Sequence, residues 1–133
     1  MHLSFISTRG QAGLDAPSVT VEVHLSAGLP AFQVVGLGDS SSREIRSRVR
    51  AALISSHLKW PDFNITVNLT PAERVTPGTR FDLPIAMGLL VASQQLPRDA
   101  IEGREFIGEL GLDGCLKPSR GALAAVLAAA QTG

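Results

Sequence analysis

A single carboxylate, Asp82, stands directly before an apolar segment, where it could bind a ligand or cap a helix. It follows a polar turn over residues 76–80 and precedes the apolar run over 84–90. A carboxylate at the apex of a loop can orient a ligand. Aspartate is also among the best N-cap residues, and Pro84 is well tolerated in a first helical turn. We interpret Asp82 as a structural cap.

Three arginines, Arg43, Arg46 and Arg50, recur on one flank of a predicted helix, whereas Arg48 falls elsewhere. Guanidinium groups spaced in this way can bind the phosphates of a nucleic acid. A solvated flank, or an interface with another domain, explains the same spacing. Because the formal net charge is zero, no global field attracts an anion. The three arginines are therefore the candidate surface for a nucleic acid or another partner.

Two glycine-rich segments have part of the spacing of phosphate-binding loops. Residues 35–38 carry only G-x-G between a predicted strand and a helix. They lack the third glycine of a dinucleotide site and the G-K-[ST] of a Walker loop, and Asp39 would repel a phosphate. Residues 108–114 are typical of a β-hairpin that turns at Asp113–Gly114. We expect tight turns at both places.

The other reactive side chains have neither catalytic nor metal-binding spacing. His2, His24 and His57 are scattered along the chain, so the sequence predicts no metal site. The only cysteine, Cys115, excludes an internal disulfide and falls in a predicted strand, where we expect a buried structural thiol. No serine lies in a G-x-S-x-G elbow.

Hydrophobic spacing predicts the strands and helices that position these residues. Alternation and turn residues predict strands over 3–7, 19–25, Ala31–Val35, 64–69, 106–111 and, as a short return strand, 115–117. The turn over 28–30 would make the second and third strands partners in a hairpin, which would begin an antiparallel meander. Helices are predicted after residues 39–41, over 83–93 and over 122–130.

The sequence also indicates how the first predicted helix begins and that the last one must pack against other parts of a protein. Ser41 and Glu44 fit the capping-box spacing at the start of the first helix. The last helix is apolar on all sides and must pack against other protein surfaces, so we expect residues 1–133 to form one domain cut from a longer protein.

The chain has neither a signal peptide nor an apolar run long enough to cross a membrane. We expect a soluble, cytoplasmic protein without a membrane partner.

Four segments carry a family resemblance in order along the chain: VTVEVHLSAGLPAFQVVGL (19–37), ITVNLTPAE (65–73), GTRFDLPIAMGLL (78–90) and FIGELGLDGCLKPSRG (106–121). Together they resemble the N-terminal domain of the magnesium-chelatase-like ComM/YifB proteins. The resemblance implies an α+β fold like that of Lon peptidases, GHMP kinases and domain 2 of a ribosomal protein. In this fold a mixed sheet of about five strands and a hairpin is packed by about three helices.

The resemblance also implies a context. In that family the domain precedes an AAA+ ATPase module and a C-terminal magnesium-chelatase-type domain, and the proteins are similar to hexameric ATPases. ComM members act as DNA branch-migration helicases in natural transformation. ATP and Mg are therefore expected for a module outside this chain, and no cofactor is expected within it. The expected partners are that module, neighbouring subunits and DNA.

The family comparison gives Asp82 a second interpretation. Lon-type peptidases carry a catalytic serine before a helix and a catalytic lysine after a later hairpin; the match places Asp82 at the serine and Leu123 near the lysine. A carboxylate cannot be the nucleophile of a Ser-Lys dyad, and leucine cannot be its base. Lys117 lies on the hairpin and is a poor replacement. The resemblance therefore predicts a non-catalytic accessory domain.

Two departures from the family pattern and two alternatives remain. Gly38 stands where a proline is usual, and residues 73–77 diverge from the family loop. The first alternative is a degenerate peptidase with residual hydrolysis, for which Thr79 is the only nearby nucleophile. The second is a phosphate-ligand-binding module of GHMP type, which rests on fold analogy alone.

Overall fold

The computed structural model describes residues 2–10, 16–71, 75, 78–117 and 129. The elements in chain order are β1 (Leu3–Arg9), β2 (Ser18–Ser26), β3 (Ala31–Val35), α1 (Gly38–Ser55), β4 (Asn64–Thr70), α2 (Asp82–Ala92), the 3₁₀ helix η2 (Arg98–Ala100), β5 (Glu109–Leu110) and β6 (Leu116–Lys117). The predicted helix over 122–130 lies outside the described residues except for Ala129, and so does Leu123. An α+β architecture is confirmed, with a four-stranded mixed sheet and a separate two-stranded hairpin.

The main sheet has the strand order β1-β2-β4-β3. Strand β2 is antiparallel to both β1 and β4, while β3 is parallel to β4. The predicted hairpin of β2 with β3, and with it the antiparallel meander, is therefore wrong. Strand β4 lies between them because its inward side chains, Ile65, Val67 and Leu69, are almost completely buried. Such a strand is best satisfied in the middle of a sheet, where both of its edges are paired.

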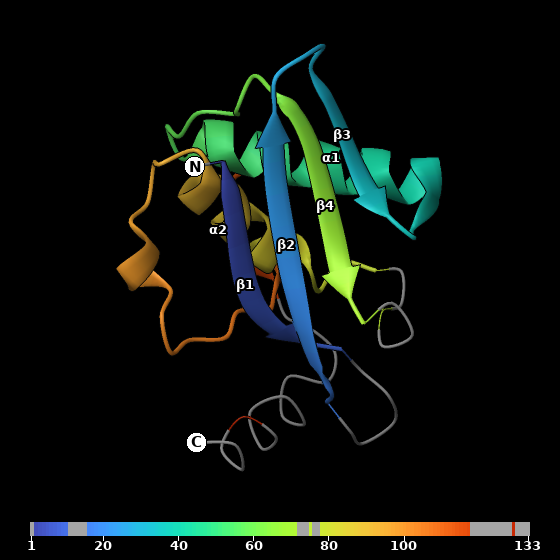
Figure 1. Ribbon diagram of the computed structural model, residues 1–133, viewed down its shortest axis with the longest axis vertical. Coiled ribbons are helices and arrows are strands. Elements are labelled where there is room, and N and C mark those ends of the chain that lie inside the picture. The colour runs from blue at the N-terminus through green and yellow to red at the C-terminus, as the bar shows by residue number, and fades with distance from the viewer. Residues whose placement is uncertain (1, 11–15, 72–74, 76–77, 118–128, 130–133) are drawn as a thin grey trace.

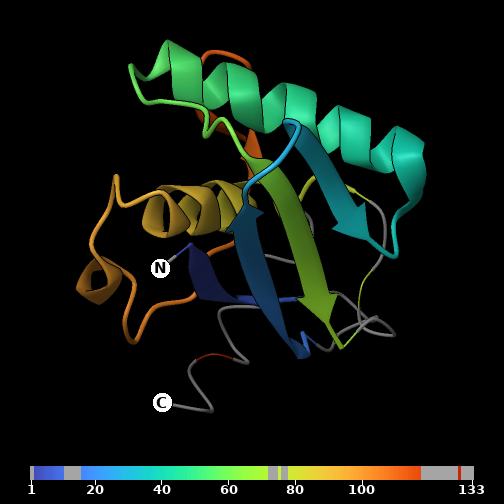
Figure 2. The same cartoon turned by 45° about the horizontal axis from the view of Figure 1, so that its top comes forward.

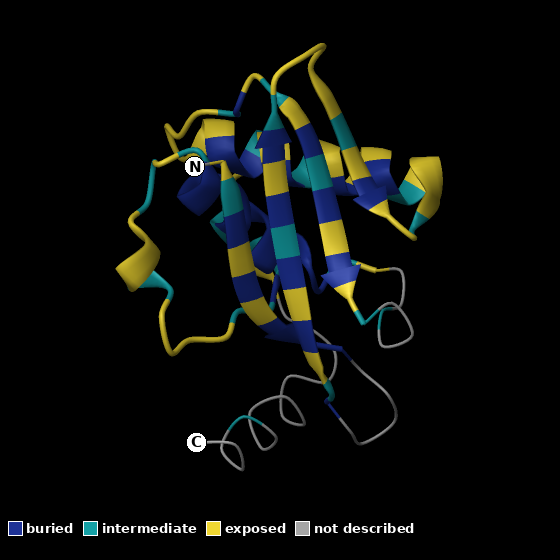
Figure 3. Cartoon of the chain, in the orientation of Figure 1, coloured by how far each residue is buried: buried dark blue, intermediate teal, exposed yellow. Residues whose placement is uncertain are grey.

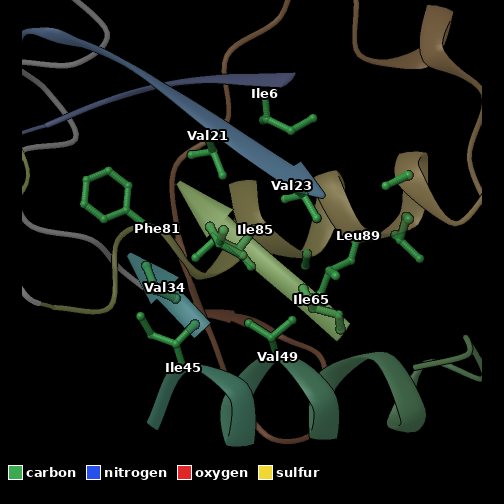
Figure 4. Close-up of a cluster of buried hydrophobic side chains, with 14 of the residues drawn as sticks. Ile6, Val21, Val23, Val34, Ile45, Val49, Ile65, Phe81, Ile85 and Leu89 are labelled. Carbon is green, nitrogen blue, oxygen red and sulfur yellow. The ribbon is translucent and has the colours of Figure 1, made fainter. Parts of the chain in front are cut away.

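Both long helices cover the same face of the sheet and lie behind the strands in the view of Figure 1; in Figure 2, α1 lies above the strands. The alternation of buried and exposed residues along β1, β2 and β4 follows from this one-sided cover (Figure 3). The core fills the space between the two layers (Figure 4). Val23 and Val34 flank Val67 in register on neighbouring strands, and Ile45 and Ile85 meet the sheet from the two helices.

The connection from β3 through α1 to β4 is left-handed. In Figure 1 the two parallel strands both point downward, α1 passes behind the sheet, and the chain moves from β3 on the right to β4 on its left. Crossovers between parallel strands of one sheet are right-handed in all but a few per cent of cases. The handedness of this unit therefore sets the fold apart from the common α/β arrangements.

Helix α2 lies close to the sheet because it carries a glycine at the contact. A Cβ built on Gly88 would lie 2.5 Å from Val23 Cγ2 and 3.3 Å from Ser4 Oγ. Ser4 Oγ instead donates a hydrogen bond to the Gly88 carbonyl at 2.7 Å. Nearly every residue of α2 is buried, so the helix has no solvent-exposed face and depends on its neighbours for stability.

Helix α1 starts earlier than the capping box predicts. Leu37 occupies the N-cap position, no side chain caps the helix by a hydrogen bond, and Ser41 lies within the first turns. The predicted cap at Ser41 is therefore wrong. Gly36 and Gly38 have φ values of +92° and +79°, which glycine adopts readily, so the chain enters the helix before it reaches the serines.

The next serine, Ser42, closes the free edge of the sheet. Its hydroxyl accepts a hydrogen bond from the Val34 N–H at 3.0 Å and lies 3.5 Å from the Val34 carbonyl oxygen. These two backbone groups of β3 point away from β4. Because an unpaired edge can pair with another chain, Ser42 removes one such site from β3.

The β5–β6 hairpin is shorter than predicted but turns where the sequence indicates. The Gly111 N–H donates to the Cys115 carbonyl at 2.8 Å, and Gly114 has a φ of +89°. Cys115 is exposed, so the predicted buried thiol is wrong. Two strands of two residues bury too little of the return strand to cover this side chain. No helix within the described residues combines the length and apolar character required to cross a membrane.

Candidate functional site

Asp82 lies at the centre of the domain and is bound to Arg48 of helix α1. Arg48 Nε donates to Asp82 Oδ2 at 2.7 Å, and Arg48 Nη2 donates to Asp82 Oδ1 at 3.0 Å. The Asp82 side chain is 0% exposed, and that of Arg48 is 21% exposed. Paired donors that match both carboxylate oxygens make this a strong, directional contact.

Asp82 is not the N-cap of α2, so the predicted capping role is wrong. The cap position belongs to Phe81, Asp82 is the first helical residue, and no side chain caps this helix by a hydrogen bond. The backbone N–H of Asp82 donates to the Thr79 carbonyl at 3.1 Å, and the N–H of Leu83 donates to the Gly108 carbonyl at 3.1 Å. Because these donors are satisfied by the backbone, the carboxylate can turn toward α1.

The carboxylate also holds the β5–β6 hairpin. The Leu110 N–H donates to Asp82 Oδ2 at 3.2 Å, and the Gly108 N–H donates to the Arg80 carbonyl at 3.0 Å. On the outer side of the hairpin, Lys117 Nζ lies 3.8 Å from Glu109 Oε2. One buried carboxylate thus joins α1, α2 and β5.

Opposing effects act on the charge of Asp82. Burial raises the pKa of its carboxyl, and the hydrogen bond and charge of Arg48, with the Leu110 N–H, offset part of that rise. The hydrogen bond with Asp82 in turn raises the pKa of Arg48. A charge this deeply buried depends on its partner.

This arrangement leaves the carboxylate unable to act as a nucleophile or a general base. Both oxygens accept hydrogen bonds, and no part of the side chain reaches solvent. Thr79 is half-buried, and no hydrogen bond joins its hydroxyl to another described side chain. Lys117, the nearby lysine, faces Glu109. The predicted second position of a dyad, Leu123, lies outside the described residues.

Arg48 is the residue that sequence reasoning missed. Its signal was present: the one carboxylate at the start of an almost fully buried helix needs a cation, because acidic side chains are rarely buried without a partner. Arg48 is also the one arginine of α1 that leaves the flank formed by Arg43, Arg46 and Arg50. Its helical position, on the side that faces α2, was the second indication.

The three predicted arginines stay together but away from Asp82. Arg43, Arg46 and Arg50 are all exposed on α1. The Arg46 guanidinium lies 5.7 Å from the centre of the Trp60 ring, and that ring makes a tilted contact with Phe32 at 5.7 Å between centroids. A cation held over an indole ring is partly fixed in place, so the Arg46 charge of this flank is held in position.

A groove of about 530 Å³ lies elsewhere, between β1, β2 and the segment around η2. Arg9 forms part of its wall, where Nε and Nη2 donate to the two carboxylate oxygens of Glu105 at 2.7 and 3.1 Å. Arg98 ties the same segment to the sheet by donating from Nη2 to the Leu3 carbonyl at 2.7 Å. Among the described residues, no three His, Cys, Asp or Glu side chains gather as metal ligands.

Comparison with known proteins identifies the family that this chain matches. The family model described as "ChlI: Subunit ChlI of Mg-chelatase" matches residues 21–133. The chain is 44% identical over all of its 133 residues to the Escherichia coli protein YifB. It is 46% identical over 129 residues, 97% of the chain, to the competence protein ComM of Haemophilus influenzae, and 40% identical over 121 residues, 91% of the chain, to a Mycobacterium tuberculosis protein. It covers 26%, 25% and 24% of these proteins, about a quarter of their length.

Proposed function

The chain belongs to the magnesium-chelatase-like family of ChlI, YifB and ComM, and from this membership we propose that it is the non-catalytic N-terminal domain of an AAA+ ATPase. In this role it acts as a rigid accessory unit for a motor that lies outside the chain. ATP and Mg are bound by that motor. Neighbouring subunits of a hexamer and DNA are the further partners, in the cytoplasm.

The observation that carries the proposal is the state of Asp82. At the position where the family resemblance places a peptidase nucleophile, the side chain is fully buried and ion-paired with Arg48. Acyl transfer requires a nucleophile that a substrate can reach and a base that activates it. A carboxylate that joins two helices and a hairpin supports a structural role for this loop.

The fold supports the more specific assignment to the Lon-like superfold. Three strands, a helix, a strand and a second helix follow one another, and the β3–α1–β4 crossover is left-handed. Because left-handed crossovers are rare, this feature separates the superfold from most other two-layer α/β arrangements. We place the Asp82 loop at the position of the peptidase loop in that superfold.

The proposed activity of the longer protein is ATP-dependent DNA branch migration. The relative named as a competence protein, ComM, supports a role in DNA uptake and processing. Within this chain, the exposed flank of Arg43, Arg46 and Arg50 is the proposed contact with DNA phosphates. Its contribution is an electrostatic one, so the affinity should fall steeply with salt.

A paired assay of the isolated chain and the full-length protein tests the accessory role. The full-length protein should hydrolyse ATP with Mg and migrate a synthetic branched DNA, whereas the isolated chain should do neither and should leave unfolded casein intact. Casein cleavage by the isolated chain that disappears in Thr79→Ala would support the peptidase alternative and overturn the proposal. A thermal shift of the isolated chain with ATP would favour a phosphate-binding module.

The DNA contact has its own test, a salt titration of single-stranded DNA. Replacing Arg43, Arg46 and Arg50 together by glutamine should weaken binding. The negative slope of log K against log salt should become shallower by about 0.7 for each phosphate that is no longer neutralised. Arg104, an exposed arginine in the segment between η2 and β5, provides the matched control, and Arg104→Gln should leave the slope unchanged. Equal slopes for the triple variant and the control would remove DNA from the partners of this flank.

A further inference from the structure

An exposed apolar surface lies on the β5–β6 hairpin and the neighbouring end of α1. Leu112 is 63% exposed, Leu116 is 61% exposed and Ile54 is 47% exposed. Cys115 between the two leucines is also exposed. These four residues are called the hairpin surface below. Isolated exposed apolar side chains are common, but several that gather on one surface indicate a contact site.

The tip of the hairpin rests on the end of α1, which joins the two parts of the hairpin surface. Ser55 Oγ, next to Ile54, donates to the Leu112 carbonyl at 2.8 Å. A Cβ built on Gly114 would lie 2.5 Å from Ser56 Oγ and 3.2 Å from the Ala52 carbonyl oxygen. The turn therefore approaches the last helical turn as closely as glycine allows, which places Leu112 beside the part of α1 that carries Ile54.

The hairpin surface is held in a fixed position before any partner arrives. Two strands of two residues cannot be stable alone, and the contacts with Asp82, Arg80 and Ser55 fasten this hairpin along its length. A surface that is already ordered loses little conformational entropy on binding. The same contacts that immobilise the hairpin face inward and leave Leu112 and Leu116 outward.

We propose that the hairpin surface is where this domain packs against the following module of the longer polypeptide of its family. This inference rests on the proposed function, since it requires an attached module. Two observations favour this partner over others. The chain covers only about a quarter of the relatives' length, and β6 ends at Lys117, so that 16 residues of this chain, 118–133, follow the hairpin. Two parts of one polypeptide can meet at an effective concentration in the millimolar range, at which a small apolar surface is enough for docking.

Hydrogen exchange tests the docking. Amides of residues 110–117 and of the last turn of α1 should exchange at least about ten-fold more slowly in the full-length protein than in the isolated chain, because packing suppresses local opening. Alkylation of Cys115, followed by peptide mapping, should slow by a similar factor. Amides of the β2–β3 turn around Leu29, which is 87% exposed, should exchange equally in both proteins.

Paired variants of the full-length protein decide between docking and other causes of protection. Leu112→Ser with Leu116→Ser should restore the exchange of the isolated chain at the hairpin, whereas Leu29→Ser should leave the protection intact. Equal exchange in the two proteins, or a natural polypeptide that ends with this chain, would overturn the docking. So would protection that appears in the isolated chain as its concentration rises, since the occupant would then be a second copy. ATP hydrolysis of the double variant separates the two ideas: ATPase activity without hairpin protection would reject the docking and keep the proposed function.

Discussion

Replacing Arg48 by methionine should destabilise the domain more than replacing any of the exposed arginines of α1. Methionine keeps much of the apolar stem that Arg48 packs but removes both donors to Asp82. The carboxylate would stay at 0% exposure without a cation. Removing one partner of a buried ion pair costs about 3–5 kcal/mol, because the other charge is left uncompensated.

Replacing the other partner, Asp82, should cost less stability. In Asp82→Asn the amide oxygen can still accept from the Leu110 N–H, and Arg48, whose side chain is 21% exposed, can turn toward water. We expect a loss of about 1–3 kcal/mol, the range for an unsatisfied hydrogen-bonding group. The double variant should be less destabilised than the sum of the two, since each change removes the same contact.

The pH dependence of the stability of Arg48→Met provides an independent test of the same ion pair. Burial already raises the pKa of Asp82, and loss of Arg48 removes an effect that lowers it. In Arg48→Met the folded protein therefore binds a proton more readily than the unfolded chain, whose aspartate titrates near about 3.9. Stability then rises as pH falls toward that value. The penalty of Arg48→Met should be largest at pH 7 and smaller at pH 5.

Urea unfolding at both pH values, with Arg43→Met as the matched control, measures these quantities. Arg43 is exposed on the same helix, and its replacement should change stability by no more than about 0.5 kcal/mol. A domain of this size loses roughly 3–5 °C of Tm per kcal/mol, so Arg48→Met should melt about 10–20 °C lower. An Arg48→Met variant as stable as Arg43→Met, or one whose penalty grows as pH falls, would refute the account of this ion pair.

Three further outcomes follow from the packing. Gly88→Ala should lower stability by about 1–3 kcal/mol in thermal melts, because overpacking against Val23 outweighs the better helix propensity of alanine; a more stable variant would show that α2 can shift away. Ser42→Ala should cost about 0.5–1.5 kcal/mol in urea unfolding, because the Val34 N–H would have no hydroxyl to bond, and an unchanged midpoint would argue against that hydrogen bond. Cys115 should react with a thiol reagent in the native isolated chain without denaturant, since it is exposed; a thiol that reacts only after unfolding would contradict its position on the hairpin.

The local elements could be predicted from sequence because their signals are local. The alternation of buried valines gives β2 its boundaries to within a residue, and the turn at Asp113–Gly114 gives the hairpin. The pairing of β3 could not be predicted in the same way. Nothing in the turn between β2 and β3 shows that Asn64–Thr70, almost forty residues after β2 ends, will lie between them. Strand order depends on which strand can bury most side chains, and that is a property of the whole core.

Only one of the two residues of the buried ion pair was predicted from the sequence. Asp82 could be singled out because a carboxylate beside an apolar helix is unusual, but its role was assigned from the nearest local explanation, a cap. Its partner, Arg48, lies 34 residues away, and only the packing of α1 on α2 brings the two together. The prediction for Ser41 failed for a similar reason, because the positive φ values of Gly36 and Gly38 let the helix start before the serines.

The insertion of β4 between β2 and β3 has a consequence for synthesis of the chain. Until residues 64–70 have left the ribosome, neither the inner edge of β2 nor that of β3 has a partner. A nascent chain that ends before β4 therefore presents two open strand edges and an uncovered set of valines, the features that lead to aggregation. Pairing over so long a separation also slows folding. Pausing of translation upstream of β4 should therefore lower the yield of folded protein more than pausing after it.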